Sequence, residues 1–150
     1  MPKEIERKFL VTGDGWRKQA DRGKTIRQAY LATTDNLSIR VRTIGKTKAF
    51  LTIKSEQSSL TRSEFEYAIP VKHAQQLMKR RNGRLIVKQR HIVKVGKSRF
   101  EVDVFRRRLR GLVIAEIELP SEKAQFERPK WLGKEVTGKK RYYNAQLARA

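Results

Sequence analysis

The sequence contains no cysteine, which excludes disulfide bonds and zinc sites built on thiolates. It has no apolar run near the roughly 18 residues of a membrane-spanning helix, and its start, MPKEIERK, lacks the apolar stretch of a signal peptide. There is no internal repeat, low-complexity tract or linker long enough to separate two domains. These absences favour a single domain over residues 1–150 and a cytoplasmic protein without a membrane partner.

Charge of one sign dominates the chain. There are 36 basic and 15 acidic side chains, which gives a formal net charge of +21. A surface of this kind attracts polyanions such as nucleic acid, polyphosphate or nucleotides. Taken alone, the charge makes a nucleic-acid-binding module the first interpretation, but it does not predict a fold.

Alternation of apolar and polar residues with period two predicts that most of the chain forms strands. A helical spacing of apolar residues follows Pro70 and predicts a helix over 71–81, and shorter helices are expected after Pro120 and in the tail from Lys140. Such a pattern is typical of a mainly β fold of the α+β kind, with an antiparallel sheet or barrel. The expected strands are 4–10, 25–34, 37–44, 49–55, 61–69, 84–95, 98–105 and 112–119.

Seven of these strands place charged residues on one face and apolar residues on the other. An antiparallel sheet with one face in water gives the same alternation. The charged face, however, holds almost no Ser, Thr, Gln or Asn, and it becomes a charged interior if the sheet closes into a barrel of about eight strands. Its residues are Glu4, Glu6, Lys8, Arg40, Arg42, Lys54, Arg62, Glu64, Glu66, Lys88, Arg90, Glu101, Asp103, Glu116 and Glu118.

This face is almost neutral, because it combines seven basic with eight acidic residues. The rest of the chain then holds 29 basic and 7 acidic side chains, or +22. A charged interior must be hydrated, internally paired or completed by a charged ligand, since unpaired buried charge is too costly. Carboxylates beside arginines suit a polyphosphate held together with a hard divalent cation. The strong basicity of the exterior therefore needs a separate explanation.

The chain resembles a known family through a motif near its start, Glu4-x-Glu6-x-Lys8. SIRVR, LTIKS, TRSEFEY, VKQR, FEVDVF and AEIEL follow in order, and WLGKEVTGKKRYYNAQLA lies near the end. Together these segments are similar to the CYTH superfamily, or triphosphate tunnel metalloenzymes, and to its bacterial inorganic triphosphatases in particular. The resemblance implies an eight-stranded antiparallel β-barrel tunnel, with a few short helices packed outside, that binds a linear triphosphate and Mg²⁺ or Mn²⁺.

The same resemblance implies roles for individual residues. Lys8, Glu6 and Lys54 are expected to take part in catalysis, whereas His73 and His91 are expected to be structural. Many relatives have an acid where this chain has Lys139, which puts a role of the tail in doubt. The expected metal ligands are Glu4, Glu6, Asp103, Glu116 and Glu118. The expected phosphate-binding residues are Lys8, Arg40, Arg42, Lys54, Arg62, Lys88 and Arg90.

The expected activity is metal-dependent hydrolysis of tripolyphosphate to pyrophosphate and phosphate. A class IV adenylate cyclase, or a hydrolase of nucleoside or thiamine triphosphate, is an alternative on the same fold. A further alternative is a non-catalytic module that binds nucleic acid or long polyphosphate through basic clusters on its outer surface. Solvated basic turns are the simpler explanation of these clusters. The clusters are Lys79–Arg81, Arg106–Arg108 with Arg110, and Lys139–Arg141.

Overall fold

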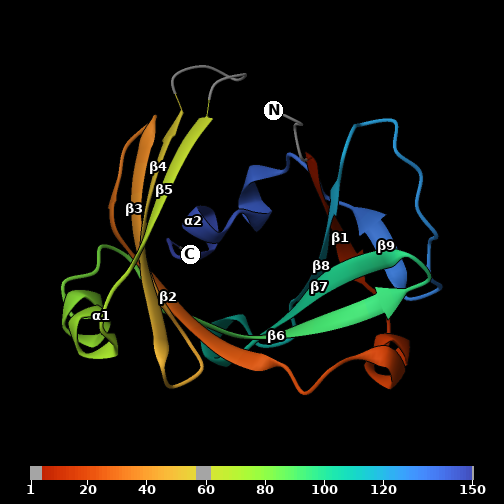
Figure 1. Ribbon diagram of the computed structural model, residues 1–150, viewed down its shortest axis with the longest axis horizontal. Coiled ribbons are helices and arrows are strands. Elements are labelled where there is room, and N and C mark those ends of the chain that lie inside the picture. Colours follow the sequence, from red (N-terminus) through yellow and green to blue (C-terminus); the bar gives the residue numbers. More distant parts are fainter. Residues whose placement is uncertain (1–4, 57–61, 150) are drawn as a thin grey trace. The chain divides into compact units, whose positions relative to one another are not determined.

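The computed structural model describes residues 5–56 and 62–149, which form two compact units (Figure 1). The first unit contains residues 5–24 and 88–139, and the second contains 25–56, 62–87 and 140–149. Each unit is thus assembled from separate stretches of the chain. None of the helices in the described residues is long and apolar enough to cross a membrane.

The first unit is built on antiparallel strands in the order β6-β7-β8-β1-β9. Their bounds are β1 Ile5–Val11, β6 Ile86–Val95, β7 Ser98–Phe105, β8 Val113–Leu119 and β9 Leu132–Glu135. The register places Glu6 opposite Glu118 and Lys8 opposite Glu116. Because side chains alternate across a strand, this register gathers the charged residues of neighbouring strands on one face.

The opposite face of these strands forms the core of the first unit. Trp16, from the 3-10 helix η1 (Gly15–Gln19), and Trp131 cover it, and both are buried. The period-two alternation in the sequence therefore sorts charge to one side of this sheet and apolar bulk to the other. The buried strand residues of this core are Phe9, Val93, Val95, Phe100, Val102, Val104, Ala115, Ile117 and Leu119.

The second unit contains antiparallel strands in the order β5-β4-β3-β2. Their bounds are β2 Lys24–Thr33, β3 Leu37–Ile44, β4 Lys48–Glu56 and β5 Arg62–Ala68. Helix α1 (Val71–Met78) lies against β3 and β4 (Figure 1), where Ala74 and Met78 pack on Val41. The 3-10 helix η3 (Lys140–Tyr142) and helix α2 (Asn144–Leu147) come from the tail.

The mainly antiparallel β architecture with few short helices is confirmed, and β3 and β7 have the bounds that the sequence predicts. Helix α1 ends at Met78 rather than Arg81. The helix expected after Pro120 is wrong: a single turn closes from Ala124 N to Ser121 O at 3.2 Å, and residues 121–139 contain no helix. Ala124 and Phe126, two residues apart, both pack on the core, a spacing that suits extended chain.

The described chain has nine strands rather than eight, because β9 was not predicted. This strand has four residues and pairs with β1, with Phe9 opposite Glu135. A Cβ atom at Gly133 would lie 2.8 Å from the carbonyl oxygen of Leu10, so only glycine allows the close approach of the two strands. A four-residue strand containing glycine gives too little alternation to be recognised in the sequence.

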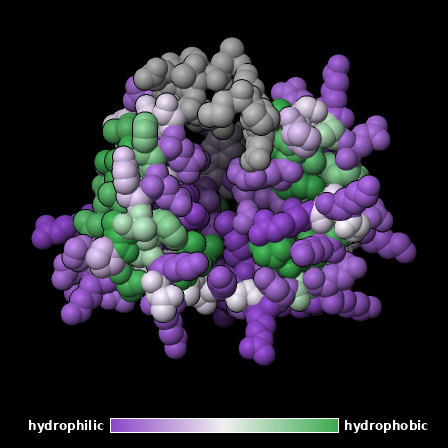
Figure 2. All heavy atoms as spheres, viewed as in Figure 1, coloured by the Kyte–Doolittle hydropathy of each residue, from purple (hydrophilic) through white to green (hydrophobic). Residues whose placement is uncertain are grey.

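Two aromatic residues of β5 are exposed. Phe65 and Tyr67 face the same side as Ile53 and Leu51 of β4, and each is 54% exposed. In Figure 2, hydrophobic side chains are visible at the surface over the β3–β5 part of the second unit. The alternation in TRSEFEY therefore predicts the strand correctly, although its apolar side is not covered in the described structure.

Strands β1 and β9 are joined by a bidentate ion pair. Arg7 donates from Nε and Nη2 to the two carboxylate oxygens of Glu135, at 2.9 and 2.6 Å. Thr137 also donates to this carboxylate, at 2.7 Å. The hydrogen bonds from Arg7 lower the pKa of Glu135 to about 2.

We expect Glu135→Gln to lower the melting temperature at pH 7. The native pKa of about 2 lies below the unfolded value, so the carboxylate stabilises the fold above about pH 4.3, and this contribution disappears as the pH falls towards 2. Thermal unfolding of wild type and variant between pH 7 and pH 2 measures it. The two melting temperatures should converge in acid, while the exposed-residue control Glu122→Gln should differ little throughout. A deficit that persists unchanged at pH 2 would contradict the ion-pair interpretation.

Candidate active site

The first unit presents what we call the carboxylate face. Its residues are Glu6, Lys8, Lys88, Arg90, Glu101, Asp103, Glu116 and Glu118. Glu6 lies opposite Glu118, and Glu116 lies opposite Glu101. Carboxylates directly opposite each other repel, so this arrangement needs cations nearby. Its oxygen donors are the ligands that hard divalent cations prefer.

Lys8 supplies one such cation. Its Nζ lies 3.2 Å from Glu116 Oε1, and the two side chains are 14% and 16% exposed. The β1–β8 register brings this pair together, because the two residues are direct cross-strand partners. The sequence motif Glu-x-Glu-x-Lys therefore places its lysine against a carboxylate of a strand that is distant in sequence.

Asp103 is the most deeply buried acid of the carboxylate face, and two cations share it. Lys88 Nζ lies 2.8 Å from Oδ2, and Arg90 donates from Nε and Nη2 to both oxygens at 2.8 and 2.9 Å. The side chains of Lys88 and Asp103 are only 1% and 7% exposed. Burial alone would raise the pKa of Asp103, but the charge of Lys88 and the hydrogen bonds from Arg90 hold it well below its usual range.

We expect Asp103→Asn to reduce the free energy of unfolding by about 3–5 kcal/mol, because it leaves two buried cations without their shared counter-charge. Urea-induced unfolding at pH 7 measures the loss. The matched control is Glu101→Gln, since Glu101 is 28% exposed and its contact with Arg90 is longer, at 3.4 Å. The control should cost less than about 1 kcal/mol. Equal losses in the two variants would contradict a special role for Asp103.

The second unit presents what we call the basic face. Arg40 and Arg42 of β3 and Lys54 of β4 share one side of the sheet. A small pocket lies here, and its lining residues are Tyr30, Ser38, Arg40, Thr52 and Lys54. On the same face, Glu66 accepts a hydrogen bond from Thr52 at 3.3 Å and lies 3.6 Å from Arg42 Nη2. Arginine forks and a lysine around a polar pocket are suited to binding phosphate oxygens.

Sequence reasoning missed several polar members of the basic face. Gln28 and Tyr30 of β2 lie opposite Arg42 and Arg40, and Thr52 of β4 also lies opposite Arg40. The expectation that this face almost lacks Ser, Thr and Gln is therefore wrong. Burial raises the pKa of Tyr30, although Arg40 opposes the shift. A register shift between Tyr30 and Ala32, together with uncharged polar residues, hides the pattern of β2 in the sequence.

Gln28 is completely buried, yet neither the oxygen nor the nitrogen of its amide has a hydrogen-bond partner within the part of the chain that the structure describes. A buried amide without partners costs about 1–3 kcal/mol of stability. Such a group is a polar feature of the basic face that folding alone does not explain.

We expect Gln28→Leu to raise the free energy of unfolding by about 1 kcal/mol in the absence of ligands, because an apolar side chain of similar size removes the unpartnered amide. Chemical denaturation of the purified variant measures the gain. The control is Thr43→Val, a buried polar residue on the other face of β3, which should give no gain. Destabilisation by Gln28→Leu would contradict the assignment of an unpartnered amide.

Of the remaining predicted site residues, some lie outside the described residues and others are exposed. Glu4 lies outside the described residues, and so does the side chain of Arg62. Glu6, Lys54 and Glu118 are exposed. Within residues 5–56 and 62–149, no group of three acidic or histidine side chains is close enough to hold a metal ion. The predicted metal ligands thus remain a prediction, supported by the oxygen donors on the carboxylate face.

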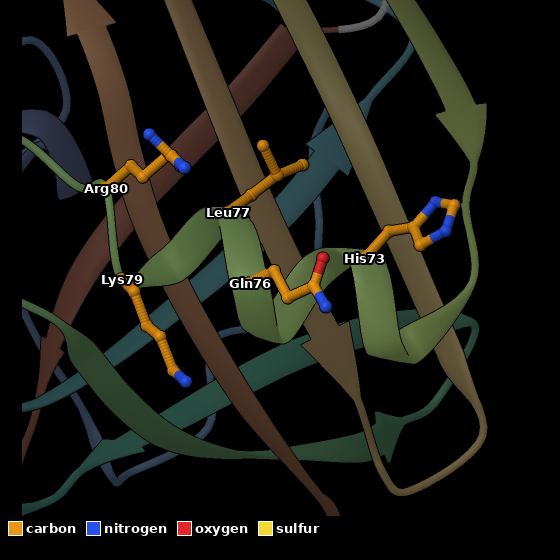
Figure 3. A pocket seen from close by; sticks show the side chains of 5 residues that line it. All are labelled: His73, Gln76, Leu77, Lys79 and Arg80. Carbon is orange, nitrogen blue, oxygen red and sulfur yellow. The ribbon is translucent and has the colours of Figure 1, made fainter.

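Neither histidine lies on the charged face of its own unit. His91 is buried beside Trp16, and its Nδ1 lies 3.0 Å from the carbonyl oxygen of Asp21. His73 lines a surface hollow along α1, together with Gln76, Leu77, Lys79 and Arg80. The labelled side chains in Figure 3 spread outward in different directions and do not converge on one point. This hollow therefore lacks the convergent polar groups of a catalytic site.

The sequence pattern of the CYTH domain matches residues 2–149. The chain belongs to the CYTH family. This match covers nearly the whole CYTH chain and confirms the resemblance seen in its motifs.

Two relatives of this CYTH chain carry the name inorganic triphosphatase. The protein from Acetivibrio thermocellus is 41% identical over 150 residues, which cover 99% of this chain and 95% of the relative. The protein from Nitrosomonas europaea is 42% identical over 151 residues, covering 97% and 96% of the two chains. A crystal structure of an inorganic triphosphatase matches with a TM-score of 0.76 and 40% identity, and covers 100% of this chain and 97% of the other.

Proposed function

We propose that this CYTH chain hydrolyses tripolyphosphate to pyrophosphate and phosphate. The observation that carries the proposal is the similarity, at 41–42% identity over nearly the whole chain, to two proteins named inorganic triphosphatase. The chemistry of both charged faces agrees with it. The basic face offers cations for phosphate oxygens, and the carboxylate face offers oxygen donors for a divalent cation.

The basic face would bind the substrate. Arg40 and Arg42 present planar guanidinium groups that match pairs of phosphate oxygens. Arg40 lines the pocket, where Lys54 adds a point charge, and Arg42 lies on the same face of β3. As the terminal phosphoryl group is transferred, negative charge grows on the leaving pyrophosphate. Lys54 and Lys8 are the lysines that we expect to neutralise it. No histidine is required for this role.

We propose that Glu6, Glu116 and Glu118 of the carboxylate face would hold Mg²⁺ or Mn²⁺ through their carboxylate oxygens, with Glu4, outside the described residues, as a further predicted ligand. When bound, such a cation neutralises phosphate charge and favours attack by water. Asp103 was also predicted as a metal ligand, but hydrogen bonds from Lys88 and Arg90 already occupy both of its oxygens. We therefore propose that Asp103 mainly positions these two cations towards phosphate.

The test is release of phosphate by the purified protein from tripolyphosphate, ATP and thiamine triphosphate, with Mg²⁺, Mn²⁺ or EDTA. We expect tripolyphosphate to be hydrolysed fastest and EDTA to abolish turnover. Glu6→Gln and Glu118→Gln should lower kcat/KM about 100-fold, because each removes a carboxylate that we assign to the cation. Glu127→Gln changes an exposed acid elsewhere in the first unit and should leave the rate unchanged.

Different failures in this experiment have different meanings. Full activity of Glu6→Gln and Glu118→Gln would contradict the metal assignment but leave the triphosphatase activity in place. Formation of cyclic AMP and pyrophosphate from ATP, without phosphate release from tripolyphosphate, would favour the adenylate cyclase alternative. No turnover of any substrate would overturn the proposed function itself.

A further inference from the structure

The turn between β7 and β8 concentrates positive charge outside the candidate site. Four of the five residues from Arg106 to Arg110 are arginines, and all four are exposed. None of them belongs to the carboxylate face or the basic face. We call residues Arg106–Arg110 the arginine turn.

The backbone of the arginine turn favours glycine at a position that holds arginine. Arg107 has φ of 55°, and it is the one non-glycine residue with positive φ in the described ranges. This left-handed conformation is unfavourable for a residue with a Cβ atom, whereas glycine adopts it freely. Hydrogen bonds close the turn from Arg110 N to Arg107 O at 3.0 Å and from Leu112 N to Leu109 O at 3.1 Å. Folding alone thus does not explain the arginine at position 107.

Three arginines of the turn, Arg106, Arg107 and Arg110, have no acidic partner among the described residues, and Arg106 is held by a neutral side chain. Arg106 Nη2 donates to Gln89 Oε1 at 2.8 Å, and Gln89 Nε2 donates to the carbonyl oxygen of Arg22 at 3.1 Å. Across the described residues, no acidic side chain forms an ion pair with Arg106, Arg107 or Arg110. Three exposed guanidinium groups without acidic partners, those of Arg106, Arg107 and Arg110, are suited to binding an external anion.

The chemistry of the turn indicates which anion. Guanidinium forks bind phosphate, but the neighbouring aromatic residue, Phe105, is buried and cannot stack on a nucleic acid base. The short turn η2 (Arg107–Leu109) lies within a segment in which four of five residues are arginines, so its charges are closely spaced. In polyphosphate, adjacent phosphates share an oxygen, whereas a sugar separates those of nucleic acid. We propose that the arginine turn is a binding site for linear polyphosphate.

The test uses Arg107→Gly, because the proposal predicts opposite effects on binding and stability. Affinity for fluorescently labelled long-chain polyphosphate should fall about tenfold at low salt, and the slope of log K against log salt should decrease by roughly 0.7. The melting temperature should not fall, and a rise of up to about 2 °C is expected because strain is relieved. Tripolyphosphate hydrolysis should be unchanged. Arg110→Ala provides a second variant in the same turn.

The matched control is Arg99→Ala, which removes one exposed positive charge from β7 away from the turn. It should retain most of the affinity for polyphosphate. Three results would overturn the proposal. The first is that Arg99→Ala weakens polyphosphate binding as much as the turn variants do, and the second is that both turn variants bind polyphosphate as tightly as wild type. The third is that the turn variants lose affinity only for a single-stranded oligonucleotide probe. The proposal does not depend on triphosphatase activity, so a chain that binds polyphosphate but hydrolyses nothing would still support it.

Discussion

The ion pairs of Asp103 are the interaction on which the charged face of the first unit depends. Lys88 and Arg90 come from β6, Asp103 comes from β7, and the lysine and the aspartate are almost fully buried. Neither cation could be buried there alone, and neither could the carboxylate, because desolvation of an isolated charge is too costly. The strands must therefore pair in the observed register for this face to exist. The same contacts fix the direction in which Arg90 presents its guanidinium group.

Charged side chains are arranged in two different ways in this molecule: as ion pairs on the carboxylate face and as a group of like charges in the arginine turn. On the carboxylate face, acids and bases satisfy one another at short distances, as in the contact of Lys8 with Glu116. In the arginine turn, like charges lie close together, and Arg106, Arg107 and Arg110 have no acidic partner among the described residues. The first arrangement stabilises a register, whereas the second leaves exposed positive charge that an external anion can bind. Net charge alone does not separate the two, since it sums over both.

Much of the fold was predictable because its signals are local. Alternation in SIRVR and FEVDVF defines β3 and β7 with correct bounds, and turn residues such as Gly96 mark the hairpins between strands. Family motifs also predict roles for the charged residues of both faces, and these roles stay a prediction. What the sequence could not provide depends on distant contacts. Strand β9 forms because it pairs with β1. Gln28 and Tyr30 are part of the basic face only because of the register between β2 and β3.

The pairing of β1 with β8 has a consequence for how the protein is made. Strand β1 leaves the ribosome well before β8, because Glu118 follows its partner Glu6 by roughly 110 residues, and contacts of such high sequence separation form late. Until then β1 is a strand with two unpaired edges, the situation in which nascent chains associate wrongly. Charges at alternate positions discourage such association. Glu6 and Lys8 would therefore reduce wrong association of the nascent chain, in addition to their proposed role in the site.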